Sequence, residues 1–438
     1  MVPGHFSAYK IVRFVLSMNR QIVSSALWLL MGLLAAATSW VYMHRVLLPW
    51  EQYFNVEAGT MKDNLGDLYS PWYGARVLLC QKRNPYSADV SREIQSAFYG
   101  HPVVQQAAPN EAPIDEQRFA YPVYTVFLLA PIARLDFRKA QAIMPFFLGV
   151  TLIVSIFLWQ SVAQWRTSLI CKLALALFIL ASPQAAQGLR LRQLGLIAVC
   201  LLAFGTWLVV KNHLPAGGVV LAFSTIKPQM AVVPLIWFLI WCMGDIRRRW
   251  RLVAGFSASF AALVVGGEML LPGWLRGFLG GLAAYRKYGP MSSPLQVVLG
   301  NTLGFAAGAA AVAGLVLWAW GQREYPESSP QFSAALAAFS CCASLALPLF
   351  PPYNQVLLFL PVFMILRDWK KLPRSGRFVF SALVLWPWLV QTVLLVKPPQ
   401  LHSMNRLPLL PAVLVILFPF VVPLLLYIRR RQISYLPT

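Results

Sequence analysis

The chain has 438 residues, a mean hydropathy of +0.61 and 12% charged residues. Soluble domains carry about 25% charged residues, so this composition excludes a water-soluble fold. The net charge of +22 does not indicate nucleic-acid binding, because the basic residues stand between apolar segments. In that position they indicate orientation in a membrane and contact with anionic membrane lipids, and we expect no nucleic acid as a partner.

Apolar stretches recur along the chain from residue 22 to residue 427. A bilayer core of about 30 Å needs roughly 20 apolar residues per helix, whereas membrane barrels show short alternating strands. We therefore expect an all-α fold, a polytopic membrane bundle of about twelve spans. The predicted spans are 22–43, 140–160, 168–184, 194–211, 214–227, 229–244, 251–271, 300–319, 331–349, 354–367, 376–396 and 407–427.

Residues 1–21 form a basic segment before the first predicted span, 22–43. Positive residues favour the cytoplasmic side, so we expect the N-terminus there and the next loop, 44–139, outside the cytoplasm with juxtamembrane helices. Within that loop, 119–137 is short and interrupted by prolines, and we expect it not to cross. The remaining bundle, 140–427, returns the tail, 428–438, to the cytoplasm. The predicted location is the cell (inner) membrane, with both termini cytoplasmic.

Asp67 is the first candidate for chemistry. It lies in the loop that holds ten of the fifteen carboxylates, just before an apolar helical pattern. An acid there can face a lipid head group, or it can simply cap the helix that follows. Asp63 lies four residues earlier and would share its face if the segment is helical. A carboxylate in a partly apolar site acts well as a general base.

An ordered set of short elements carries a family resemblance. The set is Asp67, Trp72-Tyr73, Asn84-Pro85-Tyr86, Ala120-Tyr121-Pro122, Leu129-Ala130-Pro131, Arg192-Gln193-Leu194-Gly195 and Lys227-Pro228-Gln229. Over about residues 25 to 360 the chain resembles glycosyltransferase family 87, whose members are GT-C membrane enzymes that use polyprenyl-phosphate sugars, with mannosyl transfer as the best-known activity.

The resemblance implies a hexosyltransferase with a catalytic aspartate in the first outer loop, which maps onto Asp67. It also implies transfer of a sugar, with mannose favoured, from a polyprenyl-phosphate donor to a hydroxyl of a lipid or glycan acceptor, with inversion at the anomeric carbon. Tyr73 belongs to the matched elements, and we count it among the substrate-binding candidates.

Cations are needed for the phosphate that leaves. Lys227 stands between two apolar runs, where a charge is costly and indicates function; the alternative is that it reaches the interface without a ligand. Arg190 and Arg192 are two residues apart and cannot share one helical face; we favour Arg192 because it precedes Gln193. The resemblance implies that Gln193 binds the sugar, although the usual family order, with Gly before the Gln and Asn after it, is absent here. Arg286 is a further candidate on the outer face. Arginine offers bidentate hydrogen bonds to phosphate, and lysine a point charge.

The segment after Pro351-Pro352 offers polar and aromatic groups for a sugar. Tyr353 and Asn354 are expected at the outer membrane edge, either binding sugar or forming a rigid interfacial turn. The histidines share no ligand spacing, so we expect no metal and no other cofactor. Glu268, late in a predicted span, is expected to be protonated and to face the bundle.

Two other classes of function are weighed against the enzyme. A lipid or small-molecule transporter or flippase is the alternative, but transporters tend to show repeated halves and mid-span charges. The sequence shows no internal repeat. A structural membrane scaffold would leave Lys227 and the outer cations unexplained.

Overall fold

The computed structural model describes residues 26–57, 65–103, 116–285, 292–347, 351–396 and 417–428. Every regular element in these ranges is helical, which confirms the expected all-α class. The labelled elements are η1 Met43–Leu47, α2 Leu48–Glu57, α3 Tyr69–Gln81, α4 Ala88–Tyr99, α5 Thr125–Ala133, α6 Phe137–Val162, α7 Leu169–Leu180, α8 Pro183–Arg190, α9 Gly195–Val210, α10 Leu214–Phe223, η2 Ser224–Ile226, α11 Pro228–Met243, α12 Ile246–Leu270, α13 Trp274–Tyr285, α14 Pro294–Leu299, α15 Asn301–Trp320, α16 Pro330–Ala346, η3 Pro352–Leu358, α17 Phe359–Arg367, η4 Trp369–Lys371 and α18 Arg374–Val396. Residues 26–42, which lead into η1, and Leu417–Ile428 are helical as well.

Serine followed by proline starts several of these helices. The Ser182 hydroxyl accepts a hydrogen bond from the backbone N–H of Ala185 at the start of α8, and the Ser329 hydroxyl does the same for Phe332 at the start of α16. Proline fits the first helical position because its missing N–H would lack a helical partner there. These short local signals set where the chain re-enters the bundle.

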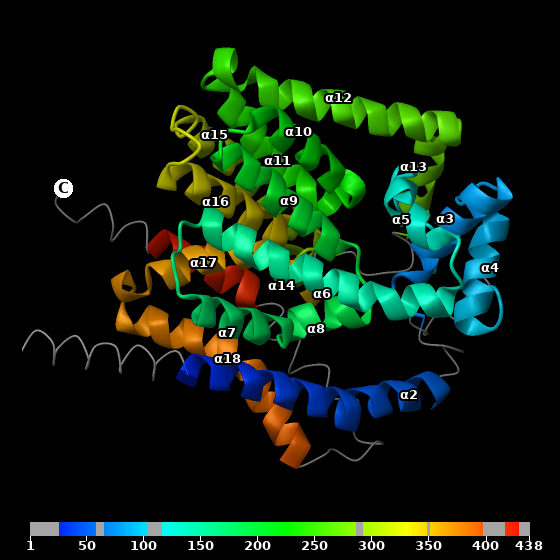
Figure 1. Ribbon diagram of the computed structural model, residues 1–438, viewed down its shortest axis with the longest axis horizontal. Helices are drawn as coiled ribbons and strands as arrows, with labels where there is room; N and C mark the ends of the chain where they lie inside the picture. Colours follow the sequence, from blue (N-terminus) through cyan, green and yellow to red (C-terminus); the bar gives the residue numbers. More distant parts are fainter. Residues whose placement is uncertain are drawn as a thin grey trace, which may run out of the picture.

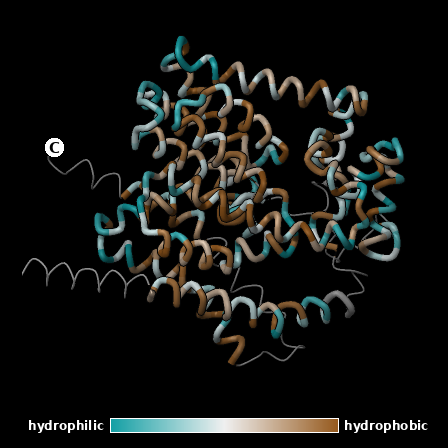
Figure 2. Tube along the Cα trace, viewed as in Figure 1, coloured by the Kyte–Doolittle hydropathy of each residue, from teal (hydrophilic) through white to brown (hydrophobic). Residues whose placement is uncertain are grey.

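Five helices are long and apolar enough to cross a membrane, or six if α7 and α8, bent by 64°, are taken as one span. The long ones are Ala26–Tyr53, α6, α12, α15 and α18. Five other predicted spans, 194–211, 214–227, 229–244, 331–349 and 354–367, coincide with shorter apolar helices of 10–17 residues. The last predicted span, 407–427, overlaps the helix Leu417–Ile428 within the described residues. The twelve-span count therefore stays a prediction, while the membrane-type bundle is evident. Figure 2 shows hydrophobic residues along the middle of the bundle and hydrophilic residues toward its ends.

Large apolar side chains point outward from the bundle. Phe146 on α6 and Met269 on α12 are each 81% exposed, and Phe305 on α15 is 72% exposed. Exposed apolar surface on this scale marks a face that contacts lipid or another partner. The inner faces meet in one large core that includes Trp159, Trp237 and Phe339.

Basic loops gather at one end of the bundle. Arg248, near the start of α12, donates to Asn212 Oδ1 over 3.1 Å and forms an ion pair with Glu327. Gln164 donates to the Ser328 carbonyl over 2.6 Å, and Arg367 donates to the Ala163 carbonyl over 2.6 Å. We call this end, at 163–164, 212, 245–249, 323–328 and 367–371, the basic end; it lies on the left in Figure 1.

The opposite end carries α3, α4, α5 and α13, on the right in Figure 1. The segment 119–137 contributes α5, which has nine residues and so spans only about 14 Å, less than half of a hydrocarbon core. The Tyr124 hydroxyl, just before α5, donates to the Thr225 carbonyl over 3.1 Å and fixes this layer to the bundle. That 119–137 does not cross stays a prediction.

One expectation about a carboxylate was wrong. Glu268 is exposed, and its Oε1 accepts a hydrogen bond from the backbone N–H of Gly273 over 2.7 Å. The expected burial fails because α12 ends at Leu270, so Glu268 lies in the last turn and bonds to the turn that leads into α13.

Candidate functional site

Lys227 lies at a break between two apolar helices. It follows η2 and precedes Pro228, which begins α11, and its backbone leaves the helical region with φ −126° and ψ 80°. Proline disfavours the helical conformation of the residue before it, which explains the break. The side chain is only 5% exposed, so the break points a cation into the protein.

Neutral groups surround the Lys227 ammonium. Its Nζ donates to Gln193 Oε1 over 2.9 Å and to Asn354 Oδ1 over 3.2 Å, and it lies 4.9 Å from the centre of the Tyr353 ring. A Cβ on Gly195 would stand 2.9 Å from Nζ, so glycine at 195 leaves the room that the ammonium fills. The structure thus unites three elements that the sequence separates: the start of α9, the η2–α11 break and η3.

Asp67 is docked onto the α8–α9 turn. Its backbone N–H donates to the Leu191 carbonyl over 2.9 Å. Gly66, at φ +63°, approaches the same turn so closely that a Cβ would stand 2.9 Å from Arg192 Nη1 and 3.1 Å from the Leu191 oxygen. Arg192 itself has φ +57°, in the left-handed region. The contact between the Asp67 segment and the α8–α9 turn is thus formed by two residues in the left-handed conformation, Gly66 and Arg192.

A single amide connects Asp67 with Lys227. The Gln193 Nε2 group donates a hydrogen bond to Asp67 Oδ2, while Gln193 Oε1 accepts from Lys227. Only this orientation of the amide satisfies both neighbours, because an ammonium can only donate and a carboxylate can only accept. The Gln193 backbone N–H also donates to the Gly188 carbonyl over 2.8 Å, so the amide is held at its base.

The helix-capping alternative for Asp67 was wrong. The N-cap position of α3 is Leu68, and no side chain caps this helix. The Asp67 carboxylate turns instead toward Gln193. Burial raises the pKa of the Asp67 carboxyl, whereas the hydrogen bond from Gln193 and then the charges of Lys227 and Arg190 act in the opposite direction. The site therefore holds a half-buried carboxylate made more basic than usual.

The two arginines of the α8–α9 turn have different partners. Arg190, the last residue of α8, forms an ion pair with Glu51, while Arg192 Nε donates to the Gln141 carbonyl over 3.2 Å. The idea that they occupy two faces of one helix does not hold, because α8 ends at Arg190. Both are half-buried, and burial lowers the pKa of the Arg192 guanidinium.

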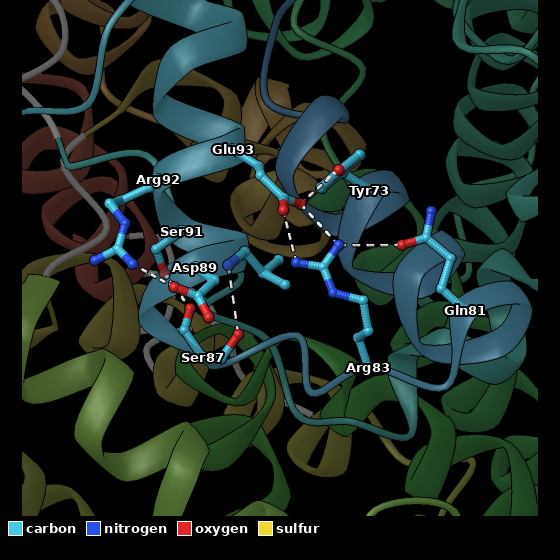
Figure 3. A network of polar contacts seen from close by, with 9 residues as sticks. Tyr73, Gln81, Arg83, Ser87, Asp89, Ser91, Arg92 and Glu93 are labelled. Carbon is cyan, nitrogen blue, oxygen red and sulfur yellow. Dashed lines mark hydrogen bonds and ion pairs between the residues drawn. The ribbon is translucent and has the colours of Figure 1, made fainter.

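Tyr73 belongs to a separate polar cluster, drawn in Figure 3. Its hydroxyl donates to Glu93 Oε2 over 2.7 Å, and Glu93 also receives two hydrogen bonds from Arg83. These contacts connect α3 with α4. Burial and then the hydrogen bond to Glu93 raise the pKa of Tyr73 to about 12. Substrate binding by Tyr73 stays a prediction. Asp63 and Arg286 lie outside the described residues, so their predicted roles stay predictions too.

Several neighbours of Asp67 were not singled out from the sequence. The pKa of the Tyr121 phenol is raised by burial and then by the charge of Asp67, which puts that ring near the carboxylate. Tyr121 stands in the Ala-Tyr-Pro element, a signal that was present but weak. Gly66 comes directly before Asp67, and Gly195 lies two residues after Gln193. Nothing in the sequence shows that a residue from elsewhere in the chain packs against either glycine.

No group of three or more His, Cys, Asp or Glu side chains lies together within the described ranges. The groups gathered at Asp67 are instead one carboxylate, amides, cations and an aromatic ring. Such a set can accept a proton at one point and hold an anion at another.

The matched family describes a membrane enzyme. The model of glycosyltransferase family 87 matches residues 119–351, more than half of the chain. The match contains Gln193 and Lys227, while Asp67 precedes it and Asn354 lies just beyond its end at residue 351. Neither a curated protein nor a solved structure matched the chain. The chain belongs to glycosyltransferase family 87 and is a membrane glycosyltransferase.

Proposed function

We propose that this protein transfers a sugar, with mannose favoured, from a polyprenyl-phosphate donor to a hydroxyl of a lipid or glycan acceptor, with Asp67 as general base. The observation that carries the proposal is the arrangement of a carboxylate and a buried ammonium on the two sides of the Gln193 amide. Transfer of a sugar from a phosphate needs both groups, one for the acceptor proton and one for the anion that leaves.

Asp67 fits the role of the base. In the proposed step the acceptor oxygen attacks the anomeric carbon, its proton passes to Asp67, and the bond to the phosphate oxygen breaks with its electron pair leaving on the phosphate. Attack opposite the leaving group inverts the anomeric centre. The contact with Gln193 uses Asp67 Oδ2, and the half-buried carboxylate would meet the acceptor through its other oxygen. Its raised pKa suits proton transfer near neutral pH.

Lys227 fits the role of phosphate ligand. Its ammonium contacts two amide oxygens and an aromatic ring, all of them neutral. A buried cation without a counter-charge is costly, and the salt bridges found among the described residues do not include Lys227. A phosphate would supply that charge. Arg192 and Arg286 are the proposed additional cations.

The other candidates would bind the sugar or place the acceptor. Asn354 and Tyr353 border the ammonium, so a sugar attached to the phosphate would meet an amide and a ring there. Asp63 and Tyr73 are proposed on the acceptor side, since both belong to the loop that contains Asp67. We propose no metal and no other cofactor, because these side chains can neutralise a monophosphate by themselves.

The proposed location is the cell (inner) membrane, with the basic end in the cytoplasm. The helix ends on that side carry Arg248, Arg249 and Arg367, and positive residues favour the cytoplasmic side. The layer of α3, α4 and α5 would then face outward, together with Asp67. Both termini would be cytoplasmic if each of the twelve apolar segments crosses once.

A transfer assay tests the proposal. Purified protein in nanodiscs receives radiolabelled polyprenyl-phosphate mannose, glucose or arabinose, with total lipid extract as acceptor, and Asp67→Asn serves as the matched variant. Label that moves to a new product with the wild type alone supports the proposal and identifies the sugar. Absence of transfer from every donor, with folded protein, would favour the transporter or flippase alternative instead.

A further inference from the structure

Gln193 sits in a position that substrate binding does not explain. Its side chain is 4% exposed, and both ends of the amide are already bonded within the protein, one to Asp67 and one to Lys227. One N–H and one lone pair of the amide remain, but a side chain with 4% exposure presents little of either to a sugar hydroxyl. The amide instead bridges two charged groups, because it donates to the Asp67 carboxylate and accepts from the Lys227 ammonium.

The amide also separates charges that would otherwise attract each other. The Asp67 carboxylate and the Lys227 ammonium are on opposite sides of Gln193, and no direct ion pair between them is found in the described part of the chain. A direct pair would make the carboxylate less basic and would occupy the cation. With the amide between them, each charge stays available to a different substrate atom.

Backbone contacts hold the spacer in place. The Gln193 N–H is bonded to Gly188, and the Asp67 N–H is bonded to Leu191 in the same turn. The base and the spacer are therefore fixed to one local structure, whose shape depends on the left-handed conformation of Arg192. Lys227 reaches this structure from another helix break.

We propose that Gln193 is a positioning residue, an amide spacer that keeps the base Asp67 and the cation Lys227 apart while it orients both. This inference rests on the proposed function and refines it, since it gives Gln193 a role in the rate of transfer rather than in binding of the sugar. Gln193 acts through Asp67, so its effect depends on that carboxylate.

Substitution of the amide by a similar apolar side chain gives the first test. We expect Gln193→Met to lower kcat about tenfold or more, because the hydrogen bond that orients the Asp67 carboxylate is lost. The donor KM should change less than about twofold, because Lys227 loses the bond to Gln193 but keeps the one to Asn354. The matched control is Gln391→Met, since Gln391 is also a buried glutamine but accepts from Ser39 in another part of the bundle. The control variant should keep wild-type kinetics. A donor KM that rises as much as kcat falls would overturn the proposal and return Gln193 to sugar binding.

A charged variant gives the second test. We expect Gln193→Glu to move the acidic limb of the kcat/KM profile to higher pH by about one unit or more, because a second carboxylate beside Asp67 raises the pKa of the pair. A limb that stays at the wild-type pH would show that residue 193 does not touch the base, and the proposal would fall. This test keeps Asp67 intact, so it does not depend on measuring residual activity in an Asp67 variant.

The double variant separates the inference from the proposed function. In an Asp67→Asn background, where long incubation with labelled donor measures residual transfer, Gln193→Met should lower transfer less than about twofold further. A full additional loss would mean that Gln193 acts independently of Asp67. Full activity of the single variant Asp67→Asn would instead refute the base assignment. If Asp67→Asn were inactive but Gln193→Met had normal kinetics, only the spacer role of Gln193 would be refuted.

Discussion

The side-chain amide of Gln193 donates a hydrogen bond to the carboxylate of Asp67, although 126 positions separate the two residues along the chain. This contact joins the segment before α3 to the turn between α8 and α9. Because the same amide accepts from Lys227, three residues from three parts of the chain form one polar group.

Asp67→Asn should abolish most of the transfer without loss of the fold. Loss of a general base lowers the rate by about 10²–10⁴-fold, while the asparagine oxygen can still accept from Gln193. The measurement is transfer of labelled sugar, beside donor binding and thermal unfolding in detergent. Donor affinity close to that of the wild type is expected, and full transfer by the variant would redirect the base assignment to Asp63.

The same variant should unfold at an equal or higher temperature at neutral pH. Burial raises the pKa of Asp67, so the folded protein binds this proton more tightly than the unfolded chain does. Stability from this group is therefore lost as the pH rises from the ordinary aspartate range through the raised pKa. An asparagine carries no charge, and thermal scans at pH 5 and pH 8 should show a smaller pH dependence than the wild type. An equal dependence would count against a perturbed Asp67.

Transfer by the wild type should rise with pH along an acidic limb that lies above the ordinary range of aspartate. The base must be ionised to accept a proton, and its pKa is raised mainly by burial. The measurement is kcat/KM for the donor between pH 4 and pH 8 at fixed ionic strength. A limb near pH 4, the ordinary aspartate value of about 3.9, would contradict a buried base.

Lys227→Met should weaken donor binding more than it affects stability. The variant removes the buried positive charge that we assign to the phosphate, and a charged hydrogen bond contributes about 1.5–3 kcal/mol, so the donor KM should rise about tenfold or more. Lys211→Met is the control, since Lys211 is an exposed lysine at the other end of α9. An unchanged donor KM would leave Lys227 without a phosphate role.

The sequence predicted the helical class and the membrane setting because both follow from composition and from the lengths of apolar runs. It also identified Asp67, Gln193, Lys227 and Asn354, because each is a polar or charged residue in a short motif next to an apolar segment. The structure brings these four into one chain of contacts. Their catalytic and binding roles remain predictions.

What the sequence could not supply is the tertiary pairing. The ordered motifs do not say that Tyr73 bonds to Glu93, because that contact depends on how α4 returns against α3. The spacing of Arg190 and Arg192 predicts side chains on different helical faces, yet the chain turns into the left-handed region at Arg192, a conformation that a short non-glycine stretch does not signal. Helix ends are likewise set by local turns, as Glu268 shows.

Gly66→Ala should disturb the site through the backbone alone. A Cβ would stand 2.9 Å from Arg192 Nη1 and 3.1 Å from the Leu191 oxygen, and the residue has φ +63°. The left-handed conformation costs a non-glycine residue about 1–2 kcal/mol, and a shift of about 1 Å in the base can reduce the rate about 10²-fold. We therefore expect a lower unfolding temperature and a large loss of transfer with little change in donor KM. Gly149→Ala, in α6 with nothing within 4 Å of its Cβ position, is the control, which should keep both properties. If the two variants behaved alike, the close approach of Gly66 to the α8–α9 turn would not determine where Asp67 lies.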